Sequence, residues 1–281
     1  MKSLFSHRPK ERLSPAQLRS WRNNGYVILE HCFGADEMAR TRNFVDRMWS
    51  ERTSTHSPLT IDVFLEPFDP RMTRMPFHSA PEEARDSVYK LNDAYLEHAY
   101  IRDIALAKGI TDALIDLIDD EPCICNSLIF ERGSQQGLHV DTYYMPPPEG
   151  SSLIVTSVCL EDVHPDAGPV QYVPGSHLLT PYRNPDGGRH VRSAEDQADA
   201  DRAMRHKLAE FGRKTEPFLG RAGDVLIWHE ELVHGGSPIV DMARTRMSLV
   251  THYWGHSAIP SDHKMQHNGG FYLRRLQQPV E

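Results

Sequence analysis

The sequence predicts a mainly β protein with helices on its N-terminal side, and three observations support this prediction. Over roughly the first 120 residues, apolar side chains recur at helical spacing next to helix-capping signals. From Pro122 onward, short apolar runs are separated by glycine and proline. The 281 residues contain no internal repeat and no linker that clearly separates two domains. We therefore expect a single domain, residues 1–281, in which helices surround an antiparallel β barrel or sandwich.

The N-terminal region, residues 1–120, is predicted to be a helical support for the β core. Ser14 followed by Pro15 is typical of a helix start. Gly25 is typical of a helix end, and it precedes an apolar stretch at residues 26–29. Helical spacing of apolar residues is found in two further zones, residues 34–52 and 81–120.

The β core is predicted over residues 121–256, and residues 257–281 form a C-terminal tail. Within the core, apolar or alternating runs are bounded by turn signals, as expected for short strands. These runs are residues 123–130, 137–144, 152–163, 170–173, 225–228, 232–234 and 243–254.

Two polar segments are predicted to lie at the mouth of the barrel. Residues 53–77 are rich in Pro, Thr and Arg and have no clear period, which is typical of a long loop and here predicts a lid. Residues 181–217 are polar and mixed in charge, and most of this stretch lacks strand periodicity, so we expect an insertion over one end of the barrel. Because loops at a barrel mouth vary most, substrate specificity is expected to reside in these two segments.

Composition excludes several function classes. The chain has 31 basic and 39 acidic side chains, a net charge of −8, which argues against nucleic acid as a partner. No apolar run approaches the roughly 18 to 20 residues of a membrane span, so no membrane partner is expected. No secretory signal is visible at the basic start, so we expect a cytoplasmic location with all four cysteines reduced. Oligomeric state is left as monomer or homodimer.

Sixteen histidines are present, and three of them begin a His-x-acid pattern. The His164 pattern contains a proline and runs directly into a turn, so it does not lie in a central strand. The His229 pattern sits where a strand ends, and its distance to His234 is i to i+5. A zinc protease helix needs its two histidines at i and i+4, so this class of enzyme is rejected.

The third pattern, His139-x-Asp141, is the candidate metal site. It lies in an extended stretch, where residues i and i+2 point the same way and place two ligands side by side. His234 is the best third ligand, because it closes an apolar run and precedes Gly235 and Gly236, which permit close approach. Taken alone, His234 is better explained as a strand-end histidine hydrogen-bonded to a turn. Two imidazoles and one carboxylate on one face of a metal leave three positions open, as in non-haem iron sites.

A carboxylate clamp is predicted one strand after His234. Arg246 and Ser248 share a face of an extended segment, and a guanidinium beside a hydroxyl suits a bound carboxylate. Arg244 lies on the same face by the same period of two, so it is the alternative to Arg246. An Arg-x-Ser pair at this distance from a candidate ligand favours the metal-site interpretation of His234.

Together these residues resemble the phytanoyl-CoA dioxygenase-like branch of the iron(II)/2-oxoglutarate-dependent oxygenases. The fold implied by this resemblance is a double-stranded β-helix, or cupin-like jelly roll, with N-terminal helices. The matching features are the triad His139, Asp141 and His234, the pair Arg246 and Ser248, the segment 162–177 with its Pro-Gly-Ser-His end, the segment 223–225 and the opening at residues 21–29.

The resemblance also implies a chemistry. Iron(II) would be held by the catalytic triad His139, Asp141 and His234, while Arg246 and Ser248 would bind the distal carboxylate of 2-oxoglutarate. With O2, the enzyme would oxidise a C–H bond of a small-molecule substrate, such as a secondary metabolite, and release succinate and CO2. Halogenases of this superfamily replace the carboxylate ligand by a small residue, so the presence of Asp141 favours hydroxylation.

Further site residues are expected around the triad. Gln136 and Thr156 are candidates for binding the co-substrate, and Tyr143, Tyr144 and Arg74 for binding the substrate, although barrel packing or surface exposure would explain them as well. Two other function classes stay open: a non-oxidative jelly-roll metalloenzyme that uses zinc, and a relative that binds a small molecule without oxidising it.

Overall fold

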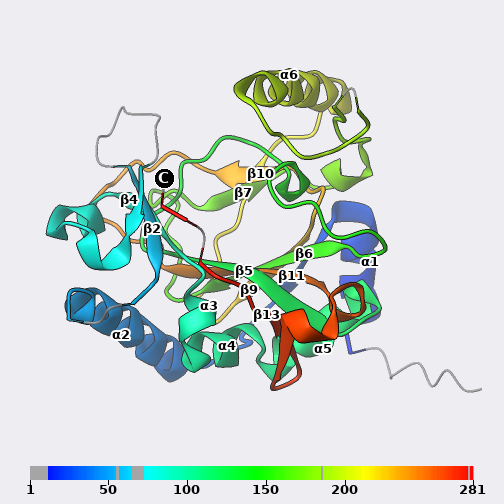
Figure 1. Ribbon diagram of the computed structural model, residues 1–281. Helices are drawn as coiled ribbons and strands as arrows, with labels where there is room; N and C mark the ends of the chain where they lie inside the picture. Colours follow the sequence, from blue (N-terminus) through cyan, green and yellow to red (C-terminus); the bar gives the residue numbers. More distant parts are fainter. Residues whose placement is uncertain (1–11, 55–56, 65–72, 185, 278, 281) are drawn as a thin grey trace, which may run out of the picture.

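The computed structural model describes residues 12–54, 57–64, 73–184, 186–277 and 279–280. Figure 1 shows its layers: helices α2, α4 and α5 cover one side of a large sheet, strands β7 and β10 lie on the other side, and helix α6 lies beyond them. Both sheets are antiparallel, apart from one parallel pairing between β13 and β5. The mainly β fold with N-terminal helices that the sequence predicts is confirmed.

The helices and strands have the following bounds. The helices are α1 (Pro15–Asn24), α2 (Ala35–Glu51), α3 (Ala94–Glu97), α4 (Ala99–Ala105), α5 (Lys108–Ile118) and α6 (Ala194–Phe211). The N-terminal strands are β1 (Tyr26–Leu29), β2 (Thr60–Phe64), β3 (Thr73–Pro76) and β4 (Val88–Asn92). The remaining strands are β5 (Pro122–Phe130), β6 (Leu153–Cys159), β7 (Val170–Tyr172), β8 (Glu216–Pro217), β9 (Val225–His229), β10 (His234–Gly236), β11 (Ser248–Gly255), β12 (Lys264–His267) and β13 (Gly270–Leu273).

Helix α1 begins and ends at the predicted signals. The Ser14 hydroxyl accepts from the Gln17 backbone N–H, and the Gln17 side chain accepts from the Ser14 backbone, which together form a capping box. Gly25 ends the helix in the left-handed region at φ 81°. The chain then enters β1, which pairs with β9 and so attaches α1 to the edge of the large sheet.

The large sheet has the strand order β1-β9-β6-β11-β5-β4-β2-β3. Its outer face packs against α2, α4 and α5 in the main hydrophobic core, which includes Met38, Ile104 and Leu114 from the helices. Side chains alternate along each strand, so Leu249 and Tyr253 of β11 join this core while Val250 and His252 face the opposite sheet. Strands β6, β11 and β5 lie side by side within this sheet and therefore form its rigid centre.

The small sheet, β10-β7-β8, faces the inner side of the large sheet. Apolar side chains from both sheets fill the space between them, among them Tyr172, Leu226 and Val250. On its other side the small sheet is covered by α6, whose Ala200 and Met204 pack with Val140, Tyr143 and Val233. Two facing antiparallel sheets are what the predicted barrel or sandwich requires.

Three segments differ from the sequence-based expectations. Part of the predicted loop 53–77 forms β2 and β3, while residues 65–72 lie outside the described residues. Strand β4 interrupts the predicted helical zone 81–120, and the insertion 181–217 contains the long helix α6. In each case the amphipathic signal is weak: the inner faces of β2 and β4 carry polar residues, and α6 buries only two side chains.

The C-terminal residues are folded onto the core. The hairpin β12–β13 joins the large sheet through β5, and Arg275 beyond it forms an ion pair with the buried Asp93 at 2.7 Å. All four cysteines are free thiols, as expected. Among the described residues, we find no helix with the length and apolar character needed to cross a membrane.

We expect Gly25→Ala to destabilise the protein more than Gly212→Ala. Both glycines end helices at positive φ, 81° and 71°, so alanine at either position costs about 1 kcal/mol in backbone strain. A Cβ atom at Gly25 would lie 2.5 Å from Nδ1 of His177, whereas nothing lies within 4 Å of one at Gly212. Urea unfolding of the two variants measures the difference in their free energies of unfolding. An equal decrease in both would show that the contact with His177 does not affect stability.

Candidate metal centre

The three predicted ligands are brought together by a backbone bridge between two distant segments. The N–H of His139 donates to the carbonyl oxygen of His234 at 2.8 Å, and the N–H of His234 donates to the carbonyl oxygen of His139 at 3.0 Å. Their ring centroids lie 4.4 Å apart. Asp141 follows His139 in a short 3-10 turn, and one donor atom from each of the three side chains lies within 4.8 Å of the others.

The two glycines after His234 permit this bridge. A Cβ atom at Gly235 would lie 2.7 Å from the carbonyl oxygen of Gln136, and one at Gly236 would lie 2.6 Å from the backbone nitrogen of Gln135. The His234 strand and the segment before His139 can therefore run side by side only with glycine at these positions. The sequence predicts that these two glycines permit a close approach near the metal. In the structure, the backbone of residues 135–137 makes this approach.

Both imidazoles present the same nitrogen to the centre. Nδ1 of His139 lies 2.8 Å from the carbonyl oxygen of Gly137, and Nδ1 of His234 lies 2.9 Å from that of Leu232. A carbonyl oxygen only accepts, so each Nδ1 carries the proton and each Nε2 keeps a free lone pair. Backbone carbonyls thus fix the tautomer and orientation that a metal-binding histidine needs.

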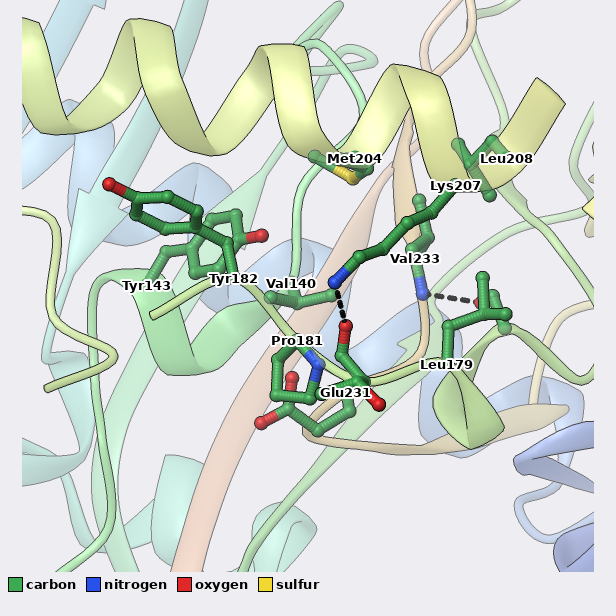
Figure 2. A pocket seen from close by; sticks show the side chains of 12 residues that line it. Val140, Tyr143, Leu179, Pro181, Tyr182, Met204, Lys207, Leu208, Glu231 and Val233 are labelled. Atoms are coloured by element: carbon green, nitrogen blue, oxygen red, sulfur yellow. Dashed lines mark hydrogen bonds between the residues drawn. The ribbon is translucent and has the colours of Figure 1, made fainter. Parts of the chain in front are cut away.

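The residues between the ligands anchor the site from behind. Val140 and Val233 alternate with the ligands and point away from them, into a cluster with Tyr143, Ala200 and Met204. Figure 2 shows Met204 on α6 above Val233 and Val140 beside a small cavity, which none of the three ligands lines. The insertion therefore supports the metal segments from outside the barrel.

The protonation states suit a cation. Burial and the neighbouring His234 lower the pKa of His139 to about 3, so this ring is neutral. Burial alone would raise the pKa of Asp141, but the neighbouring imidazoles of His234, His252 and His139 outweigh it and hold this pKa below its ordinary value. The buried carboxylate is therefore ionised, and the neutral ring of His139 lies beside it.

The donor set fits iron(II). Two imidazole nitrogens and one carboxylate oxygen on one side of a point are the ligands of mononuclear non-haem iron sites, and they leave the remaining positions open. All three residues are buried, with between 6% and 7% of their surface exposed. Oδ2 of Asp141 accepts from Nε1 of Trp228 at 2.8 Å, which leaves Oδ1 turned toward His234.

The structure separates the two candidate arginines. Arg244 is exposed and pairs with Asp241 at 3.1 Å, whereas Arg246 is buried and forms no ion pair with any described carboxylate. Burial lowers the pKa of Arg246 to about 10. Its Nε and the hydroxyl of Ser248 are both buried without a hydrogen-bond partner. Unpartnered buried donors of this kind are costly, so the pair is suited to a bound carboxylate.

Two further predicted residues lie beside the centre. The ring of Tyr144 is 5.5 Å from that of His139, and its hydroxyl donates to Gln197 of α6 at 3.2 Å. Burial raises the pKa of Tyr144, and the nearby side chain of Gln136 acts against this rise. With 43% of its surface exposed, Tyr144 is accessible on the metal side of the barrel.

Three predicted residues are not brought to the centre. Tyr143 points into the cluster under α6, on the far side of the metal segment. Thr156 lies on the outer face of β6, where its hydroxyl is 3.3 Å from that of Tyr253. Arg74 lies on β3 and binds both carboxylate oxygens of Asp62, at 2.6 and 2.8 Å.

Sequence reasoning missed three residues near the centre: Trp228, His252 and Lys90. Nε2 of His252 lies 3.6 Å from Oδ1 of Asp141. Burial and His234 are the main causes of the lowered pKa of His139, and Lys90 of β4 adds a smaller effect in the same direction. The three residues come from three separate strands and share no spacing, so the only available signal was an unexplained polar residue on the inner face of a strand.

Comparison with known protein families identifies the family of this chain. The family model described as phytanoyl-CoA dioxygenase (PhyH) matches residues 21–246, well over half of the chain. This range includes the triad and Arg246. A comparison with curated proteins finds no match.

Several solved structures resemble the chain. The non-heme alpha ketoglutarate dependent carbocyclase SnoK from nogalamycin biosynthesis is 20% identical, with TM-score 0.64, over 92% of this chain and 88% of that one. The epimerase SnoN from the same biosynthesis is 18% identical, with TM-score 0.61, over 92% and 97%. EctD from S. alaskensis with bound Fe is 16% identical, with TM-score 0.62, over 99% and 85%. These likenesses confirm the double-stranded β-helix fold.

We expect the stability of the metal-free protein to fall as pH decreases from about 6.5. Burial is the main cause that lowers the pKa of His139 to about 3 and of His229 to about 4, from an ordinary value of 6.5. Below pH 6.5 the unfolded chain therefore binds protons that the folded chain does not, and unfolding is favoured by about 1.4 kcal/mol per pH unit for each group.

Urea unfolding of wild type and His229→Gln between pH 4.5 and 7.5 measures this effect. Because the variant lacks one of the two groups, its free energy of unfolding should fall less steeply with decreasing pH, by about 1.4 kcal/mol per pH unit. Parallel curves for the two proteins would contradict the assignment of a depressed pKa to His229.

Proposed function

The chain belongs to the phytanoyl-CoA dioxygenase family, and on this premise we propose that it hydroxylates a C–H bond of a small-molecule substrate. Its cofactors are iron and 2-oxoglutarate. The observation that supports the proposal most is the intact triad His139, Asp141 and His234 beside a buried arginine and serine that have unpartnered polar atoms. The balanced reaction consumes substrate, 2-oxoglutarate and O2 and yields alcohol, succinate and CO2.

Each residue has a defined task in this proposal. His139, Asp141 and His234 hold the iron, and Arg246 and Ser248 bind the distal carboxylate of 2-oxoglutarate. When bound, the iron and 2-oxoglutarate supply the oxidising chemistry. The chain's residues orient the two reactants and exclude water, since Trp228, Arg246 and His252 around the ligands are buried.

Lys90 adds positive charge for the anionic co-substrate. Leu91 pairs with Ile129, so the preceding residue, Lys90, lies opposite Phe130. Phe130 in turn pairs with Ser248 on the next strand. The ammonium group of Lys90 is 3.8 Å from Oδ2 of Asp62, whose carboxylate is already bound by Arg74. Lys90, Arg74 and Asp62 therefore form a cluster of charged side chains on the same inner face as Ser248.

The proposed substrate contacts lie beside the ring of His139, at Tyr144 and Gln136. Gln197 of α6 binds the Tyr144 hydroxyl. The insertion 181–217 thus reaches the rim of the site, which supports its proposed part in specificity. The relatives named above include a carbocyclase and an epimerase, so the product of this chain needs to be identified directly. Hydroxylation adds one oxygen atom, ring closure removes two hydrogens, and epimerisation leaves the mass unchanged.

We expect His139→Ala to abolish succinate release from 2-oxoglutarate that depends on iron(II), O2 and substrate. Loss of a direct ligand should exceed the roughly 10- to 100-fold effect of removing a residue that supports one. His164→Ala is the matched control, since His164 begins the exposed His-x-Asp pattern and should retain wild-type activity. Turnover with Zn(II) in the absence of O2 would instead favour a non-oxidative metalloenzyme.

We expect Arg246→Met to raise the KM for 2-oxoglutarate by about ten- to a hundredfold, because hydrogen bonds to a charged group are worth about 1.5 to 3 kcal/mol. Arg244→Met should leave this KM unchanged, because Arg244 is exposed and pairs with Asp241. Steady-state kinetics at saturating substrate measure both values. If only Arg244→Met raised the KM, the clamp would have to be moved to that residue.

A further inference from the structure

The carboxylate of Asp141 lies between two side chains of the large sheet. Trp228 on β9 and His252 on β11 each pair with Val155 of β6, so the three occupy one row on the inner face. Nε1 of Trp228 donates to Oδ2 of Asp141 at 2.8 Å, and Nε2 of His252 lies 3.6 Å from Oδ1. One carboxylate oxygen therefore faces the indole and the other faces the imidazole.

We propose that Trp228 and His252 form a clamp that makes Asp141 a one-oxygen ligand of the metal. The inference rests on the proposed function in taking Asp141 as an iron ligand. Trp228 occupies Oδ2, while Oδ1 lies 3.7 Å from Nε2 of His234 and so faces the centre. A carboxylate that bound through both oxygens would fill one of the three open positions, all of which 2-oxoglutarate and O2 require.

His252 is suited to this positioning role. Its ring is 5% exposed, and its Nδ1 is buried without a hydrogen-bond partner in the described part of the chain. The tautomer with its proton on Nε2 directs an N–H at Asp141, whereas the other tautomer would set a lone pair against the carboxylate and bury an unpaired N–H. The cross-strand neighbour Asn126 is turned away, because its amide donates to Asp93 at 2.9 Å.

The row also explains why the clamp holds one geometry. Trp228 is 3% exposed, and its ring lies 5.1 Å from that of His234. The apolar Val155 separates the indole from the imidazole, so the two side chains reach the carboxylate from either side without touching one another's polar atoms. Their strands β9, β6 and β11 are adjacent in the large sheet, whose outer face is packed against the helices.

The test compares His252→Phe with His252→Gln in the full chain. Phenylalanine keeps the ring volume without a donor, whereas glutamine keeps an N–H donor. Dissociation constants for Fe(II) and Co(II) are measured anaerobically without 2-oxoglutarate, together with the visible spectrum of the Co(II) form. We expect His252→Phe to weaken metal binding by about 10- to 100-fold and to change the Co(II) spectrum. His252→Gln should recover most of the affinity, and the exposed control His263→Gln should match wild type.

Trp228→Phe is a second variant that removes the donor to Oδ2. It should change the Co(II) spectrum in the same direction, because the freed Oδ2 can then approach the metal. Wild-type affinity and spectrum in His252→Phe would overturn the clamp. So would equal weakening in His252→Phe and His252→Gln that is matched by equal loss of thermal stability in the metal-free proteins, because this result indicates packing alone.

The same measurements separate the clamp from the proposed function. A wild-type protein that binds Fe(II) and Co(II) but never releases succinate would overturn the proposed function, while the effect of His252→Phe on metal affinity would still decide the clamp. A wild-type protein that binds neither metal would overturn both.

Discussion

The site depends on one interaction above all: the pair of backbone hydrogen bonds between His139 and His234. It joins a segment that follows β5 to the start of β10 and brings two tilted imidazole rings together near the Asp141 carboxylate. The glycines after His234 make the close approach possible, and backbone carbonyls turn both Nε2 atoms inward. Because backbone fixes two of the ligands, the site is largely formed before a metal arrives.

The layers on either side of this bridge have different tasks. Behind it, Val140 and Val233 pack under α6, so the insertion supports the ligand segments and also reaches the rim through Gln197. In front of it, the large sheet presents Trp228 and His252 to the Asp141 carboxylate. The site therefore lies between the rigid large sheet and the ligand segments that α6 covers. Variation in the insertion can alter specificity without moving the ligands.

The sequence contained most of the fold and the triad, because both have local signatures. Period-two strands, turn residues and His-x-Asp can be read from neighbours in the chain. The period of two could not distinguish Arg244 from Arg246, because it places both on one face of an extended segment. In the structure, β11 begins only at Ser248, and a turn carries Arg244 outward. Trp228 and His252 depend on the register of three strands, which no local pattern specifies. Helix α6 was missed because its apolar stripe is narrow.

The most direct test of the account is an anaerobic titration of 2-oxoglutarate into the Fe(II)-loaded protein, followed by visible absorption. If iron and 2-oxoglutarate bind together between the triad and Arg246, a metal-to-ligand charge-transfer band should develop and saturate at one equivalent. The band should be lost in Asp141→Ala. Bound iron with no band at saturating 2-oxoglutarate would contradict the central claim that this barrel brings the metal and the co-substrate together.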